Sequence, residues 1–290
     1  MATELKPHIS FIDKSFKDSQ IRTYQLAIQL DLYGLDFIVF NPEKNKFIAL
    51  ESYKFDEGTK IEELSLMFDK ILNHHQWFAY PFGKVFFLCQ NNFYTLIPSP
   101  LFEAKEKSLY LGFNQPFQEN SRIVYENLKN TGAVNIFYIT NPVVEKVKDF
   151  WPNAKLNHIA GAFIESLSLN YKNRLSGNEM FINVRNGSFD LAFFKNNKLF
   201  YGNSFTYRTK EDFIYFLLSA VEHLALNPED INLIITGKID KGSPEYEMIY
   251  QYIKTNTFIT KNDNFLYSYL MDNFAHHYFY VLFNVFQCEL

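Results

Sequence analysis

The sequence has few cysteines: only Cys89 and Cys288, which stand far apart in the chain. Neither belongs to a spacing that is typical of metal ligands, so we expect no disulfide framework and no zinc site. Cys89 lies in an apolar run without a basic neighbour, which predicts an unreactive thiol.

Long hydrophobic runs are also absent. Residues 1–20 carry scattered charges and no apolar core of signal-peptide length, and no later run approaches the roughly 20 apolar residues of a membrane span. The net charge of −4 and the pI near 6.0 give no overall attraction to nucleic acid or anionic lipid. The sequence predicts a cytoplasmic protein that has no membrane span and binds no nucleic acid.

The common catalytic signatures are missing too. The sequence has no P-loop, no dinucleotide-binding glycine pattern, no Gly-x-Ser-x-Gly and no His-Glu-x-x-His. Two adjacent histidine pairs occur, at 74–75 and 276–277, and adjacent side chains point in different directions on a helix or a strand. Neither pair alone forms a metal clamp, so we name no metal ligand and no catalytic residue.

Aromatic residues, by contrast, are abundant, with 32 Phe and 19 Tyr. Most recur at the alternating spacing of strands or along one face of a helix, as in KVFFL and DFIYFLL. This pattern favours packing in a core over stacking on a ligand.

The chain contains an internal repeat, in which residues 181–258 match residues 26–90. Both segments have three strand-like runs joined by short turns, then a helical run and a buried-type strand, and Asp36 matches Asp190. The short turns require antiparallel neighbours before the helix. The sequence therefore predicts two α/β halves, each with its own five-stranded mixed sheet, that meet near residues 160–178.

Local signals place the other elements. Thr209 and Asp212 form a capping-box pattern before an apolar run, which predicts a helix start. Residues 98–121, with three prolines and a run of charges, indicate a surface excursion, and residues 265–290 are expected to form a helix and then a strand on the second half. Further helices are expected at 59–73, 141–150, 158–173 and from 244 to 252.

The stretches LYGLDFIVFN, TLIPSPLF, NGSFDLAFF and NSFTYRTKEDFIYFLL resemble an uncharacterised bacterial family of the actin, sugar kinase and heat-shock chaperone ATPase superfamily. Within that superfamily the chain is similar to PilM-like pilus-assembly proteins and to the cytoplasmic domains of L-type type II secretion proteins. The resemblance covers nearly the whole chain. It implies two actin-like, ribonuclease H-like domains, at residues 1–165 and 166–290, with a cleft between them.

An active member of this superfamily would carry Asp-x-Gly in the first turn of each half. Here Gln29-Leu30-Asp31 and Asn183-Val184-Arg185 stand at these places, and the glycine-rich turn near adenosine is reduced to Thr236-Gly237-Lys238. We predict that ATP binds poorly or not at all, and we name no cofactor. The candidate nucleotide or anion ligands that remain are Asp31, Gly34, Asn183, Arg185, Gly187, Ser188 and Gly237.

Each candidate also has a structural interpretation. Asp31 suits a turn, Asn186-Gly187 is the strongest local signal for a hairpin, and an Arg at a strand end usually pairs with a carboxylate. Gln90 lies near the place where the superfamily has its catalytic side chain, but it is equally the polar end of a strand.

Three functional classes stay open. The first is a non-catalytic actin-like scaffold that binds a protein partner, the second a weak nucleotide-binding protein or ATPase, and the third a small-molecule enzyme with a rebuilt cleft. The missing Asp-x-Gly favours the scaffold. We expect its protein-binding surface on the strand at 199–207, where Tyr201 and Tyr207 share a face, unless these rings pack beneath the helix that starts at 209.

Overall fold

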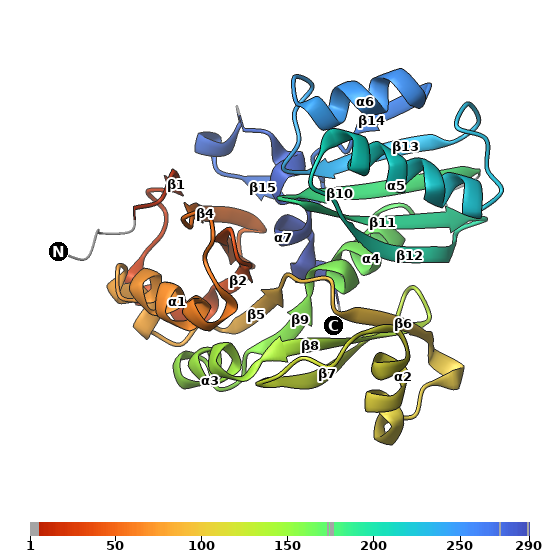
Figure 1. The fold of residues 1–290 in the computed structure, drawn as a ribbon. Coiled ribbons are helices and arrows are strands. Elements are labelled where there is room, and N and C mark those ends of the chain that lie inside the picture. The colour runs from red at the N-terminus through yellow and green to blue at the C-terminus, as the bar shows by residue number, and fades with distance from the viewer. Residues whose placement is uncertain (1–5, 173, 175–176, 273, 289) are drawn as a thin grey trace.

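The computed structural model describes residues 6–172, 174, 177–272, 274–288 and 290. Two large mixed sheets face each other across a central layer of helices, and a smaller sheet lies beside them (Figure 1). Residues 26–55 and 181–207 lie in separate sheets, which confirms the duplicated α/β architecture.

The first large sheet has the strand order β1-β4-β3-β2-β5-β9, and β15 also pairs with β4. Its core, β4-β3-β2-β5-β9, contains three antiparallel strands followed by two parallel ones. Its strands are β1 (Ile9–Ile12), β2 (Gln25–Leu30), β3 (Gly34–Asn41), β4 (Lys46–Lys54), β5 (Lys84–Cys89), β9 (Lys155–His158) and β15 (Leu266–Tyr267).

The second large sheet repeats this topology in the order β12-β11-β10-β13-β14. Even the irregularities agree, since each half has a register shift three residues after its matched aspartate, at Val39/Phe40 and at Phe193/Phe194. The strands are β10 (Asn178–Arg185), β11 (Ser188–Lys195), β12 (Lys198–Thr206), β13 (Asn232–Gly237) and β14 (Thr255–Phe258).

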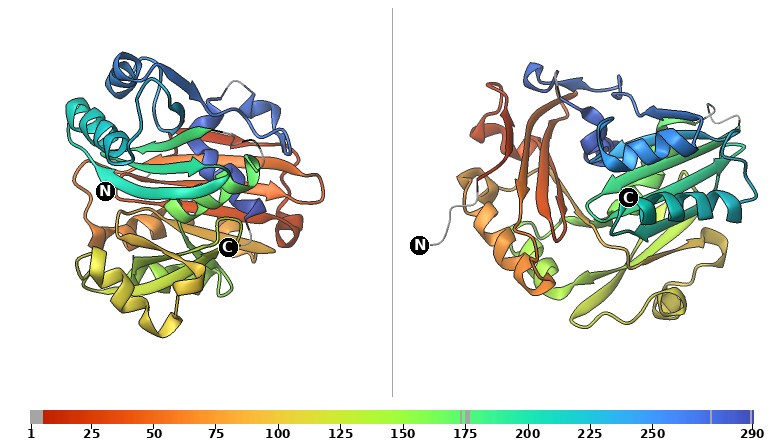
Figure 2. Two further views of the ribbon diagram at one scale, coloured as in Figure 1. Left: turned by 90° about the vertical axis from the view of Figure 1, so that its right-hand side faces the viewer. Right: turned by 45° about the horizontal axis from the view of Figure 1, so that its top comes forward.

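Helices cover both faces of each large sheet. Between the sheets lie α4 (Ile159–Asn170) and α7 (Tyr280–Asn284), whose apolar residues pack with both sheets in one core cluster (Figure 2). The outer face of the first sheet carries α1 (Leu64–Leu72) and α3 (Asn141–Phe150). The outer face of the second carries α5 (Lys210–His223) and α6 (Pro244–Tyr252). The Thr209–Asp212 capping box forms at the start of α5 as predicted.

The first half is larger than expected because it carries a third sheet, ordered β6-β8-β7. The strands β6 (Tyr94–Pro98), β7 (Ser121–Leu128) and β8 (Ala133–Thr140) share a small core with α2 (Lys107–Asn114). The excursion expected at 98–121 therefore contains a helix. The first large sheet also has seven strands, not the predicted five.

The C-terminal segment differs from the prediction. Its strand β15 comes before its helix, not after it, and pairs with β4 of the first half, while α7 packs between the two large sheets. The apolar residues of this segment join the core cluster between the sheets, where they are removed from water. The predicted division after residue 165 falls inside α4 and stays a prediction.

Among the described residues, no helix combines the length and apolar character needed to cross a lipid bilayer.

Candidate functional site

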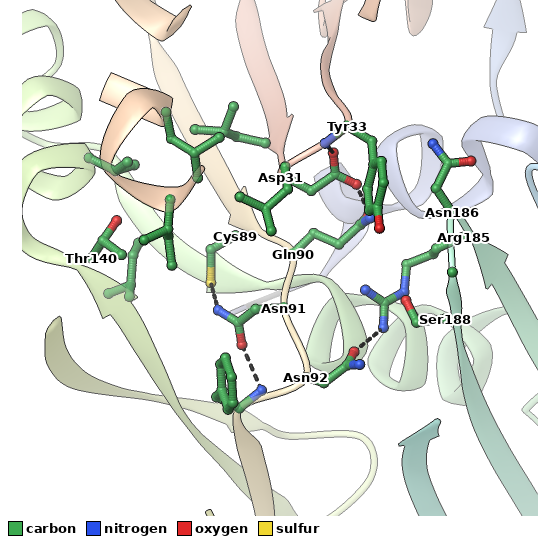
Figure 3. A pocket seen from close by; sticks show the side chains of 18 of the residues that line it. Asp31, Tyr33, Cys89, Gln90, Asn91, Asn92, Thr140, Arg185, Asn186 and Ser188 are labelled. Carbon is green, nitrogen blue, oxygen red and sulfur yellow. Dashed lines mark hydrogen bonds between the residues drawn. The ribbon is translucent and has the colours of Figure 1, made fainter. Parts of the chain in front are cut away.

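The candidate site is a cleft where the first turns of the two halves meet. The first turn links β2 to β3, and the second, at 185–188, links β10 to β11. Beside them lies a cavity of about 310 Å³ (Figure 3). Its described lining comprises Leu30, Asp31, Leu32, Tyr33, Ile61, Leu64, Phe87, Cys89, Gln90, Asn91, Asn92, Phe93, Ile139, Thr140, Val143, Arg185, Asn186, Gly187, Ser188 and Thr206.

Asp31 holds the first turn together. Its Oδ1 accepts hydrogen bonds from the backbone N–H groups of Tyr33 at 2.7 Å and of Gly34 at 2.8 Å. Its Oδ2 accepts one from Gln90, whose own Oε1 accepts from Gln29 at 2.6 Å. Burial raises the pKa of Asp31 above its ordinary value. The carboxyl group is thus engaged within the first half.

Arg185 occupies the matching position in the second turn. Its Nη2 donates to Asp190 at 2.7 Å and to Asn92 of the first half at 2.8 Å. Asn92 in turn donates to Thr206 at 2.7 Å. The arginine is only 6% exposed, and its Nε has no hydrogen-bond partner among the described residues. The guanidinium therefore links the two halves through Asn92.

The polar groups behind the two turns follow one pattern. In the first half Gln29 faces Asp36 across the β2–β3 pair, and Ser52 donates to Asp36. In the second half Asn183 donates to Asp190 at 3.0 Å, and Ser204 donates to it at 2.5 Å. Each half thus holds one buried aspartate between an amide and a serine. The repeat extends to the polar interior, not only to the strands.

Lys238 supplies a second link between the halves. It follows β13 of the second half, and its Nζ lies 2.9 Å from Asp36 Oδ2 of the first half. Burial disfavours its charged form, but the carboxylates of Asp36 and Asp31 raise its pKa above the ordinary value. Both buried aspartates therefore have a cationic partner.

A smaller cavity also borders the two turns. A second cavity, lined by residues that include Asp31, Asn183, Arg185, Gly237 and Lys238, measures about 10 Å³. A volume of this size holds about one water molecule. The two positions that would carry the metal-organising carboxylates hold the amides Gln29 and Asn183 instead. These residues do not fit a Mg-bound triphosphate.

Six of the seven predicted ligands line one or both of these cavities. Gly187 and Ser188 line the larger one, Asn183 and Gly237 line the smaller one, and Asp31 and Arg185 line both. Gly34 lines neither.

The two glycines outside the larger cavity have structural reasons to be glycine. A Cβ on Gly34 would meet the carbonyl oxygen of Tyr53 at 2.2 Å. Gly237, with φ +92°, would meet Val184 at 2.1 Å. Such backbone contacts tolerate no side chain.

Three site residues went unrecognised in the sequence: Asn92, Thr206 and Lys238. Each makes its contact with the opposite half, so no local spacing reveals it. The sequence did offer one signal. In the repeat β13 matches β5, so Lys238 and Gln90 directly follow equivalent strands.

Cys89 is buried, and His75 and His277 are partly buried. Cys89 lines the larger cavity, and burial raises the pKa of its thiol. His75 lies 2.7 Å from Glu51, and His277 lies 2.9 Å from the carbonyl oxygen of Ile239. Within the described ranges no group of three or more His, Cys, Asp or Glu residues is arranged to hold a metal ion.

The strand face that was expected to bind a partner is largely covered. Tyr201, Phe205 and Tyr207 of the β12 region pack against the core of the second half, and Phe205 stacks on Phe216 of α5 at 5.8 Å between ring centroids. The alternative interpretation, that these rings lie beneath the helix after Thr209, is the better one.

Comparison with models of known protein families identifies the family of this chain. Residues 13–255 match the model of a family described as "Protein of unknown function (DUF3822)". The chain belongs to this family. No curated protein matches the sequence of this DUF3822 member.

Solved structures confirm the actin-like fold. A Bacteroides thetaiotaomicron protein, described as having an actin-like ATPase fold and unknown function, is similar with a TM-score of 0.76 and 24% identity over 86% of this chain and 96% of that chain. The PilM–PilN type IV pilus biogenesis complex is similar with a TM-score of 0.60 and 11% identity, over 92% and 98%.

Proposed function

We propose that this DUF3822 protein is a non-catalytic, actin-like module that binds a protein partner in the cytoplasm. The observation that carries the proposal is the pairing inside the cleft. The two cations nearest the turns, Arg185 and Lys238, are each matched by a buried aspartate. Charges that an ATPase would present to phosphate are thus engaged with the protein itself.

The likeness to the PilM–PilN complex supports a protein partner, because that neighbour is described as part of a biogenesis complex. Proteins of one fold differ widely in function, so the partner needs its own support from this chain. That support comes from exposed apolar side chains.

The segment around α2 exposes several large apolar side chains. Phe113 is 88% exposed and Phe117 78% exposed, and Leu101 and Leu109 are also exposed. Apolar side chains that cluster on a surface mark protein interaction sites. We name these four residues the α2 patch and propose it as the partner surface.

The test compares matched variants. Phe113→Ser changes the α2 patch, while Tyr215→Ser changes an aromatic residue of α5 that is 66% exposed and lies outside the patch. Both substitutions affect exposed side chains, so both proteins are expected to fold.

Proteins cross-linked in native lysate are identified by mass spectrometry and then purified for titration. The proposal predicts a direct partner whose Kd is unchanged by Tyr215→Ser and at least about tenfold weaker with Phe113→Ser. A partner bound equally by both variants would place the surface elsewhere. ATP turnover by the purified wild type would refute the non-catalytic part.

A further inference from the structure

The larger cavity of the cleft has an apolar interior and an apolar mouth. Leu64, Phe87 and Val143 form buried parts of its wall. At the mouth, Leu32 and Ile61 are 38% and 41% exposed. Its volume of about 310 Å³ lies within the range of small-molecule sites. Water forms few hydrogen bonds in an apolar cavity, so its displacement by an apolar ligand is favourable.

One end of the cavity is polar. Arg185 lines this end together with Ser188, on the side opposite Cys89 and Thr140 (Figure 3). The Nε of Arg185 is buried and has no hydrogen-bond partner among the described residues. Ser188 also lines this end, and its hydroxyl can donate a hydrogen bond to an acceptor on a ligand.

The charges around the cavity disfavour an ionic ligand. Among the described residues that line the cavity, Asp31 and Arg185 are the two with ionisable acidic or basic side chains. Arg185 already faces Asp190 at 2.7 Å, and Asp31 accepts from two backbone N–H groups and from Gln90. An anion would bring a negative charge close to two carboxyl groups without meeting a free cation. A cation would have to share the carboxyl oxygens of Asp31 with three donors that already bind them.

We propose that this cavity binds an uncharged small molecule with an apolar body and one carbonyl-type acceptor, which lies toward the polar end at Arg185. The apolar body contacts Leu64, Phe87 and Val143. The proposal concerns a site for a small molecule, and it does not depend on the partner surface at α2.

The probe for this test is 6-acetyl-2-dimethylaminonaphthalene, an uncharged fluorophore whose emission shifts to the blue in apolar surroundings. Two relatives serve as comparisons: 6-dimethylamino-2-naphthoate, which is an anion, and 2-dimethylaminonaphthalene, which lacks the acceptor. Fluorescence titration of the wild type is expected to show saturable binding of the ketone. Loss of one hydrogen bond should weaken binding about fivefold, and an unmatched charge should weaken it about tenfold or more.

Two variants locate the bound probe. Ile61→Asp places a charge at the mouth and is expected to weaken binding of the ketone about tenfold, and Val143→Phe fills the interior. Leu66→Asp is the matched control, because Leu66 is 54% exposed on α1 and does not line the cavity. Its affinity should equal that of the wild type.

Three results would overturn the proposal. They are the absence of saturable binding of the ketone, tighter binding of the naphthoate than of the ketone, and an Ile61→Asp variant that binds like Leu66→Asp. Because Ile61 is partly exposed, the Ile61→Asp comparison remains valid even if Val143→Phe fails to fold.

Discussion

The two halves of this protein share one strand topology but present opposite charges at their first turns. Asp31 directly follows the first strand of one repeat, and Arg185 occupies the equivalent place in the other. The first half keeps its carboxyl group within its own turn, whereas the second sends a guanidinium to Asn92 across the cleft. Duplication preserved the scaffold and the buried aspartates. The side chains that meet in the cleft differ between the halves, and Arg185 and Lys238 each contact the opposite half.

A second difference lies at the ends of the parallel strands β5 and β13. The backbone N–H of Gln90 donates to Leu30 at 3.1 Å, while that of Lys238 donates to Val184 at 2.8 Å. The preceding residue is Cys89 in the first half and Gly237 in the second. The tighter approach in the second half therefore depends on a residue without a Cβ.

The largest effect should come from closing that approach. Gly237→Ala would place a Cβ 2.1 Å from the carbonyl oxygen of Val184, at a φ of +92°. We expect a loss of about 3–5 kcal/mol in the free energy of unfolding, measured by urea denaturation. Gly242→Ala is the control, because no atom lies within 4 Å of its added Cβ. Equal stability of the two variants would show that the backbone relaxes.

The next effect compares the two buried aspartates. Asp190→Asn leaves Arg185, 6% exposed, without its counter-charge and should cost about 3–5 kcal/mol of unfolding free energy. Asp36→Asn should cost about 1 kcal/mol, because the side chain of Lys238 is 33% exposed and water replaces the partner. Urea denaturation of both variants checks the order. Equal costs would contradict the idea that the second half holds the more deeply buried pair.

The third prediction concerns the three-stranded sheet, which is a further difference between the halves because only the first half carries it. Glu126 of β7 accepts from Asn135 at 2.9 Å and from Asn157 of β9 at 2.8 Å. Burial raises the pKa of Glu126 to about 7 from an ordinary 4.5. The folded state then holds a proton that the unfolded state releases. Its contribution to stability is thus lost as pH rises from about 4.5 to about 7.

The variant Glu126→Gln removes this titration. Its unfolding free energy relative to the wild type should rise by about 3 kcal/mol between pH 4.5 and pH 7 and stay level above pH 7. His158 is present in both proteins, so the pH dependence that comes from its pKa, lowered by burial to about 3, cancels in the difference. A difference that does not change with pH would mean that Glu126 is ionised throughout.

The smallest effect concerns the bridge between the halves. Thr206→Val removes the acceptor of the 2.7 Å bond from Asn92. Because Thr206 is exposed, we expect a loss of less than about 1 kcal/mol of unfolding free energy. Thr260→Val, at another exposed threonine, is the matched control. A loss above about 2 kcal/mol would mean that the bridge stabilises the closed cleft more than its exposure indicates.

The repeat made much of the fold predictable. Alternating apolar residues and short turns located the three antiparallel strands of each half, and the match of Asp36 to Asp190 gave the register of the buried aspartates. Capping residues located the start of α5. These features depend on contacts between residues close in sequence, which local patterns record.

Features that depend on distant contacts were not predictable in this way. The pairing of β15 with β4 joins residues more than 200 positions apart, and the link from Lys238 to Asp36 crosses between the halves. The exposed rings near Phe113 fall in a segment whose prolines and charges indicated only a loop. For Tyr201 and Tyr207 the alternation of the strand was correct, but it does not say which face a helix covers.

The most direct test of this account is isothermal titration calorimetry of the wild type with Mg-ATP. The account predicts no saturable heat at micromolar to low-millimolar ATP, because Arg185 and Lys238 are already paired and the amides Gln29 and Asn183 stand where carboxylates are needed. Arg185→Gly should not create binding, since it removes a cation without supplying the missing carboxylates. A one-to-one isotherm with a micromolar Kd in the wild type would contradict the claim that internal pairs have replaced the nucleotide.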